Sequence, residues 1–230
     1  MTEEDEGTIA RRTVVAAIGP GVVALGAVTA PRDASAKDSR WQPTLEKDDD
    51  WMEIPSRHRI VFDATSSEGA AHSLFFARNF ISVNQSDYGI GQSQLATIII
   101  LRHMATVFGY NDEIWAKYGK TLSNMSNFTD PKTKEAPTRN LYDVKGFGPG
   151  LANADATVSE LAGQGVHFAV CGAATQRVAA MVAAETKSDA EVIRRELVSH
   201  LVPNGRIVAA GIVAVNRAQE RGYAVSYYTP

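Results

Sequence analysis

The feature that most constrains the fold is an apolar run, Leu95-Ala-Thr-Ile-Ile-Ile-Leu101, which no charged residue interrupts. Such a run is typical of a strand that is buried on both faces, as in a parallel sheet. A second short apolar run, His58 to Ala64, also predicts a strand. Apolar residues at helical spacing over 69–85 predict a helix between these two strands, as a parallel connection requires.

The same alternation of strand and helix returns near the end of the chain. Further elements are predicted as helices over 153–164, 173–185, 188–201 (with Ser188 as its cap) and 211–221, and as strands over 166–170, 206–209 and 223–228. This pattern predicts right-handed βαβ units in one doubly wound α/β domain over residues 57–230. Residues 109–150 interrupt the pattern with a short predicted helix over 111–118 and then polar, Pro-rich and Gly-rich sequence. We expect a long loop or insertion there, which is uncommon in compact domains unless it is functional or disordered.

The N-terminal residues resemble an export signal. Arg11-Arg12 precede a mildly apolar run that ends in the small residues Val28-Thr29-Ala30. This predicts a cleaved twin-arginine-type signal peptide over residues 1–30 and a periplasmic or other extracytoplasmic location. The run is shorter than the roughly 20 apolar residues of a membrane span, so no stable span is expected after cleavage. An uncleaved anchor and a coincidental pattern stay open. Residues 31–56 are polar, which indicates a surface arm that Trp41 and Trp51 could pin to the domain.

Composition excludes several function classes. With 23 basic and 26 acidic residues the chain has a formal net charge of −3, so it lacks the basic surface that nucleic-acid binding requires. The single cysteine, Cys171, excludes an intramolecular disulfide and a Cys-rich zinc site. The five histidines show no paired ligand spacing. A metal would bind only if His72, His103 and Cys171 converged from three elements, so we expect no metal and no cofactor.

Three sequence stretches resemble the DsrE/DsrF-like proteins, which are linked to sulfur relay. They are Arg59-Ile-Val-Phe-Asp-Ala-Thr-Ser66, Phe168-Ala-Val-Cys-Gly-Ala-Ala-Thr-Gln-Arg177, and Leu201-Val-Pro-Asn-Gly-Arg-Ile-Val-Ala-Ala-Gly211 running into Gln219-Glu-Arg-Gly-Tyr-Ala224. Each motif is short, and their order and spacing over residues 57–228 are more specific than any one of them. The stretch from Leu101 to Tyr118 is similar to what exported members have after the second strand.

The resemblance implies a flavodoxin-like three-layer α/β/α sandwich with a parallel five-stranded sheet in the order 2-1-3-4-5. It also implies a homo-oligomer, trimer or hexamer, and a protein that donates or accepts sulfur as partner. Some members have a cysteine after the third strand that accepts sulfane sulfur, and Cys171 matches it; others lack it. The leader and the insertion depart from the cytoplasmic relay members, so the cytoplasmic partners are not assumed.

That strand order places the reversal of direction between strands one and three, where ligands of open α/β sheets bind. We therefore expect side chains to converge from the loops after the first three strands: Ser66 and Glu68, Arg102 and His103, Cys171 and Gly172. Cys171 directly precedes a helix, whose positive N-terminal end favours the thiolate, and Gly172 leaves room for a substrate. The alternative is that Cys171 is a small buried residue closing its strand.

The other candidates each have a chemical and a structural interpretation. His103 exchanges a proton or orients a ligand, or it caps a strand end. Arg102 holds an anion or lies free at the surface, and Glu68 is a base or a favourable charge in the first helical turn. Trp115 and Tyr118 form a lid over the edge or pack against a neighbouring subunit.

Two functions from different classes follow. The first is an exported sulfur carrier or sulfurtransferase in which Cys171 bears a persulfide. The second is a non-catalytic module of the cell envelope that binds a small ligand or assembles into an oligomer. Exposure of the Cys171 sulfur, and whether it shares a pocket with His103, separates the two.

Overall fold

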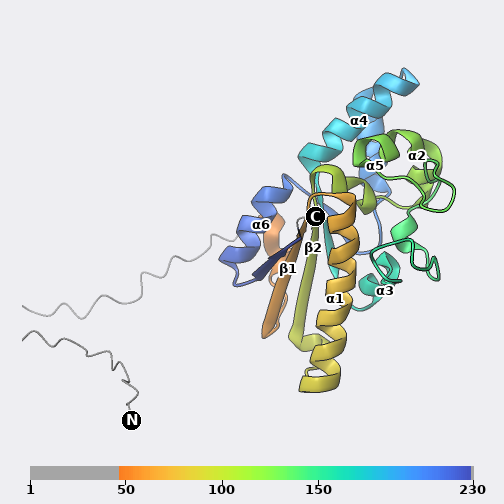
Figure 1. Ribbon diagram of the computed structural model, residues 1–230. Coiled ribbons are helices and arrows are strands. Elements are labelled where there is room, and N and C mark those ends of the chain that lie inside the picture. Colours follow the sequence, from red (N-terminus) through yellow and green to blue (C-terminus); the bar gives the residue numbers. More distant parts are fainter. Residues whose placement is uncertain (1–46, 229–230) are drawn as a thin grey trace, which may run out of the picture. The chain divides into compact units, whose positions relative to one another are not determined.

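The computed structural model describes residues 47–228 (Figure 1). The signal peptide predicted over 1–30, Trp41 and most of the predicted arm lie outside the described residues. The strands are β1 His58–Ala64, β2 Leu95–Leu101, β3 His167–Cys171, β4 Gly205–Val208 and β5 Ala224–Tyr227. The α-helices are α1 Ser67–Tyr88, α2 Asp112–Ser126, α3 Val158–Gly163, α4 Gly172–Thr186, α5 Ala190–Ser199 and α6 Gly211–Glu220. The 3-10 helices are η1 Lys47–Met52, η2 Gln92–Gln94, η3 His103–Gly109 and η4 Leu141–Asp143. None of the helices within 47–228 is long and apolar enough to cross a bilayer.

The five strands form one parallel sheet in the order β4-β3-β2-β1-β5. The predicted α/β class with a parallel five-stranded sheet between helical layers is confirmed, but the order 2-1-3-4-5 is wrong. The physical reason is the apolar character of β2, every residue of which is buried. An edge position would leave one side of this strand open to solvent. The edges are instead β4 and β5, which are short and half-buried or exposed.

The handedness of the connections decides which helices cover which face. From β1 to β4 the chain moves along the sheet in one direction, so right-handed crossovers place α1 to α5 on one face, here called the α1 face. The return to β5 runs the other way and places α6 on the opposite, α6 face (Figure 1). Side chains alternate between these faces: Phe168 and Val170 belong to the cluster on the α1 face, and Ala169 to the cluster on the α6 face.

The region predicted as a loop or insertion over 109–150 is more ordered than expected. Its helix α2 extends to Ser126 rather than ending near 118. The chain beyond α2 packs into the α1-face core, and Leu141 and Phe147 are buried there. The buried Asn140 amide donates to the backbone oxygens of Phe108 at 2.9 Å and Tyr110 at 3.1 Å. Backbone groups of this segment are thereby satisfied by a side chain rather than by regular structure.

Two predicted helix starts are wrong. Asp189, not Ser188, caps α5, because its carboxylate accepts from the N–H groups of Glu191 and Val192, both at 2.9 Å. The helix predicted over 153–164 begins only at Val158. Ala154 and Asp155 before it have positive φ, a left-handed conformation that a right-handed helix does not allow.

The end of the predicted arm is attached to the domain, as expected for Trp51. Met52 in η1 is fully buried against the α6-face core, and the Tyr223 hydroxyl donates to its backbone oxygen at 2.8 Å. The Arg206 guanidinium lies over the Trp51 ring, 5.1 Å from its centroid. η1 therefore belongs to the layer of α6.

Candidate functional site

Cys171 lies where the sequence predicted, at the junction of β3 and α4. By the alternation along β3 its side chain belongs to the α6 face, with Ala169. Its sulfur accepts hydrogen bonds from the N–H of Ala174 at 3.5 Å and of Gly211 at 3.2 Å. Ala174 lies in the first turn of α4 and Gly211 is the first residue of α6, so the starts of two helices meet at one sulfur atom.

The Cys171 sulfur lies at the N-terminal ends of two helices. Each helix start presents backbone N–H groups that have no partner within the helix, together with the positive end of the helix dipole. The N–H groups of Ala174 and Gly211 are the donors that these two helix starts provide to the sulfur. The residue is buried and only 6% exposed, so by the criterion of exposure the structure favours the non-catalytic alternative.

A charged pair flanks the cysteine on the same face. Arg102 donates twice to the buried Asp63 carboxylate, from Nε at 2.7 Å and from Nη2 at 2.9 Å. The hydrogen bond to Asp63 raises the pKa of Arg102, burial opposes it, and the charges of Asp63, Tyr227 and Cys171 raise it further. A Cβ on Gly211 would lie 2.5 Å from the Cβ of Arg102, so Gly211 permits close approach of the arginine to the start of α6.

Gly172 does not leave the room that was predicted for a substrate. A Cβ at this position would lie 2.8 Å from the backbone oxygen of Val208 and 3.2 Å from that of Ala209. The absence of a side chain allows α4 to begin close against the end of β4, so its role in the structure is packing.

His103 and Cys171 do not share a cavity. The backbone is extended at Arg102, so the alternation that carries Arg102 to the α6 face carries His103 to the α1 face. His103 is exposed, has φ 55°, and lines a cavity of about 220 Å³ with Met104, Met125, Arg177 and Met181. The predicted pairing of imidazole and thiol is therefore not present.

The corrected strand order moves the reversal to between β1 and β5. Ser66 lies there and caps α1, its hydroxyl accepting from Gly69 N–H at 3.0 Å. Glu68 accepts from the Tyr228 hydroxyl at 3.3 Å and lies 3.6 Å from His72, whose ring stacks on Tyr228. These residues form a separate cluster on the β5 side of β1. Cys171 lies on the other side of β1, at the end of β3.

Trp115 and Tyr118 are parts of the α1-face core rather than a lid. Trp115 is fully buried and its Nε1 donates to the backbone oxygen of Val107 at 3.2 Å. Tyr118 is also buried, and its hydroxyl donates to Glu196 at 2.7 Å. Full burial leaves Trp115 no surface to offer a substrate or a neighbouring subunit.

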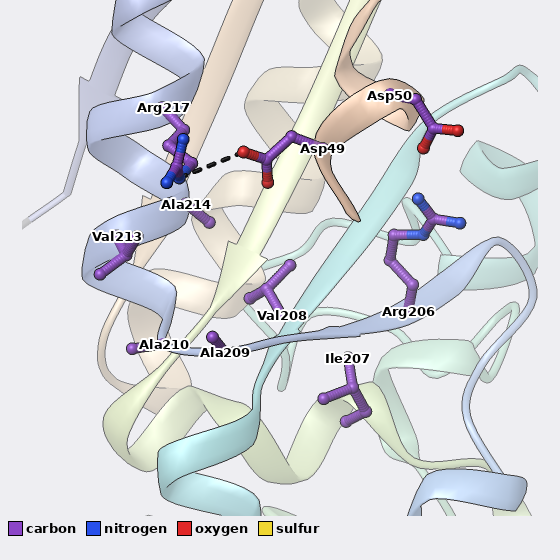
Figure 2. Close-up of a pocket in the computed structure, with 10 residues that line it drawn as sticks. All are labelled: Asp49, Asp50, Arg206, Ile207, Val208, Ala209, Ala210, Val213, Ala214 and Arg217. Carbon is purple, nitrogen blue, oxygen red and sulfur yellow. Dashed lines mark ion pairs between the residues drawn. The ribbon is translucent and has the colours of Figure 1, made fainter. Parts of the chain in front are cut away.

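Sequence reasoning missed a cavity of about 550 Å³ on the α6 face, between β4, α6 and η1 (Figure 2). Its rim is charged: Arg217 Nε lies 3.1 Å from the Asp49 carboxylate, and Arg206 comes from β4 (Figure 2). Its wall includes Val208, which is the register partner of Cys171 and lies on the same face. Cys171 is not itself among the residues that line the cavity; it lies on the neighbouring strand. The acidic run at 48–50 was the one signal for it in the sequence.

No group of three or more His, Cys, Asp or Glu residues within 47–228 is placed to hold an ion. His72, His103 and Cys171 lie at three different places, as described above.

Fold and site together define a class: an open parallel α/β protein with one cysteine at the carboxyl edge of its sheet, held by the starts of two helices. No protein-family model, curated protein or solved structure matches the chain. The resemblance to DsrE/DsrF-like proteins therefore stays a prediction.

Proposed function

We propose that this protein is a DsrE-like sulfur carrier of the cell envelope in which Cys171 accepts and passes on sulfane sulfur. The observation on which this depends is the pair of backbone N–H groups, from Ala174 and Gly211, that donate to the Cys171 sulfur. The same donors suit a persulfide, which also has a negative charge to be stabilised. The cavity beside Val208 gives a donor molecule a place to approach on the same face of the sheet.

The transfer step is a thiol exchange that needs no oxidant. The Cys171 thiolate attacks the outer sulfur of a donor persulfide, R–S–SH. A new sulfur–sulfur bond forms at Cys171, the bond within the donor breaks, and the donor leaves as its thiolate R–S⁻. The reverse exchange with an acceptor thiolate returns Cys171 to its starting state.

Mass spectrometry of the full chain after incubation with a persulfide donor tests the proposal. We expect an added mass of about 32 Da, one sulfur atom, that is removed by a reducing agent. Cys171→Ser should lose the adduct. His103→Ala should keep it, because His103 lies on the opposite face and serves as the matched control. A folded protein whose thiol is alkylated by a small reagent but never gains the sulfur atom would contradict the proposal.

A second candidate, an assembly module, is favoured by exposed apolar residues beside the same cavity. Ile212 and Val213 in the first turn of α6 are 57% and 43% exposed. Apolar surface next to a charged rim is typical of a subunit contact. Analytical ultracentrifugation of Val213→Asp should show dissociation of the oligomer, whereas Val83→Asp, at a similarly exposed position on α1, should not. An oligomer unaffected by both changes, or a monomeric wild-type protein, would contradict this candidate.

The proposed location follows from the twin-arginine-type leader over residues 1–30. Export of the protein, shown by a shortened N-terminus in a cell-envelope fraction and lost in Arg11→Lys/Arg12→Lys, tests it. A precursor that stays uncleaved in the cytoplasm would contradict it.

A further inference from the structure

The cavity of about 220 Å³ on the α1 face has a lining of unusual composition. Met104 in η3, Met125 at the end of α2, and Met181 in α4 supply three thioether side chains. The remaining lining residues are His103 and Arg177. The cavity is therefore mostly apolar with two nitrogen-bearing groups at its wall, the usual make-up of a small-molecule site.

Arg177 is the group in this lining that is available for a ligand. It is exposed, and its guanidinium forms no hydrogen bond or ion pair with any residue in 47–228. By contrast Arg102 and Arg194 in the same range both hold a carboxylate with two hydrogen bonds. No Asp or Glu is among the residues lining the cavity, so its electrostatic character is positive.

The size of the cavity limits the ligand. An apolar protein cavity of about 150 Å³ holds one benzene molecule. A cavity of about 220 Å³ therefore accommodates one aromatic ring, or a short aliphatic chain, with an acidic group attached. Methionine side chains have several rotatable bonds and polarisable sulfur, so they adapt to such a ring and make favourable contacts with it.

We propose that the cavity between η3, α2 and α4 binds a small apolar carboxylate of about the size of benzoate. The carboxylate pairs with Arg177, whose planar guanidinium donates two parallel hydrogen bonds, and the apolar body lies against the three methionines. A soft metal ion is the competing occupant, since thioethers and imidazole are ligands for Cu(I) and Ag(I). The unpaired positive charge of Arg177 repels a cation and attracts an anion, so the cavity favours the carboxylate.

Isothermal titration calorimetry of the full chain with benzoate tests this site independently of the thiol chemistry. Benzoate should bind at millimolar concentrations or better, and the neutral analogue benzamide should bind much more weakly. Arg177→Gln should weaken benzoate binding about tenfold or more, the effect of losing a hydrogen-bonded charge. Arg57→Gln, another exposed arginine remote from the cavity in the sequence, is the matched control and should change nothing.

Three outcomes overturn the proposal. Benzoate fails to bind at all; benzoate and benzamide bind equally; or Arg177→Gln leaves the affinity unchanged. A parallel titration of Cys171→Ser protein with Ag(I) separates the competing occupant, because the substitution removes the thiol as a ligand. Silver binding that Met125→Leu and Met181→Leu abolish, in a protein that does not bind benzoate, would assign the cavity to a soft metal.

Discussion

Removing the guanidinium of Arg102 should destabilise the protein strongly, because it leaves the Asp63 carboxylate buried and unpaired. The Asp63 side chain is 7% exposed and that of Arg102 is 25% exposed. Breaking a buried pair from one side costs about 3 to 5 kcal/mol, and the partial exposure of Arg102 favours the lower end. Arg102→Met keeps the packing of the side-chain stem against Gly211. A loss of about 3 kcal/mol lowers the melting temperature of a domain of this size by about 6 to 12 °C.

The assay is urea unfolding followed by circular dichroism, with a thermal melt beside it. The matched control is Arg194→Met, which removes an equally close bidentate pair with Glu191 in which the side chains are 36% and 54% exposed. This exposed pair should contribute far less to stability, because solvent screens its charges. Asp63→Asn combined with Arg102→Met should recover part of the loss, because no charge then stays buried. Equal effects of the two arginine substitutions would refute the argument from burial.

Three further changes probe stability elsewhere. Ser66→Ala should cost about 1 kcal/mol in urea unfolding because α1 loses its cap, and Ser66→Asp should restore most of it; no loss in the alanine variant would remove the cap as a cause. Gly119→Ala should destabilise by about 1 to 3 kcal/mol despite the better helix propensity of alanine, because its Cβ overlaps the Pro137 carbonyl oxygen; a more stable variant would contradict this. Burial and, less strongly, Arg206 lower the pKa of His167 below its ordinary 6.5. As the pH falls, His167 is therefore protonated in the unfolded chain before it is protonated in the folded protein. Stability should therefore fall as pH drops below about 6.5, and His167→Gln should have a shallower fall than wild type; identical pH profiles would exclude His167 as the source.

The bounds of the first two strands and the junction at Cys171 were predictable because local sequence signals determine them. The bounds of β1 and β2 were predicted as they occur, since each is an apolar run ended by polar residues. The position of Cys171 between a strand and a helix was also predictable. Val166 to Val170 is a short apolar run typical of a strand, and the alanine-rich stretch after Gly172 is typical of a helix.

Which strands are neighbours was predicted wrongly because the order was taken from the resemblance. The complete apolarity of β2 contained the better information, since it requires strands on both sides. Once β2 separates β1 from β3, the loop with Ser66 and Glu68 can no longer face Cys171. The error in strand order thus separated Ser66 and Glu68 from the rest of the predicted site.

The remaining errors concern the direction of side chains. Arg102 and His103 are adjacent in sequence, and sequence alone did not show that the strand alternation continues through Arg102. Arg102 consequently lies on the same face of the sheet as Cys171, and His103 lies on the opposite face. Trp115 was predicted to form a lid over the edge or to pack against a neighbouring subunit; its side chain instead points into the core and is fully buried.

The pairing of β1 with β5 has a consequence for how the chain is made. Strands one to four follow one another across the sheet, so each can join its predecessor as it leaves the ribosome. The other side of β1 stays unpaired until Ile60 can pair with Ala224, the first residue of β5. Until then the nascent domain has an open, apolar strand edge that invites aggregation. Closure of this edge of the sheet therefore has to wait until β5, which follows all the other strands along the chain, has been made.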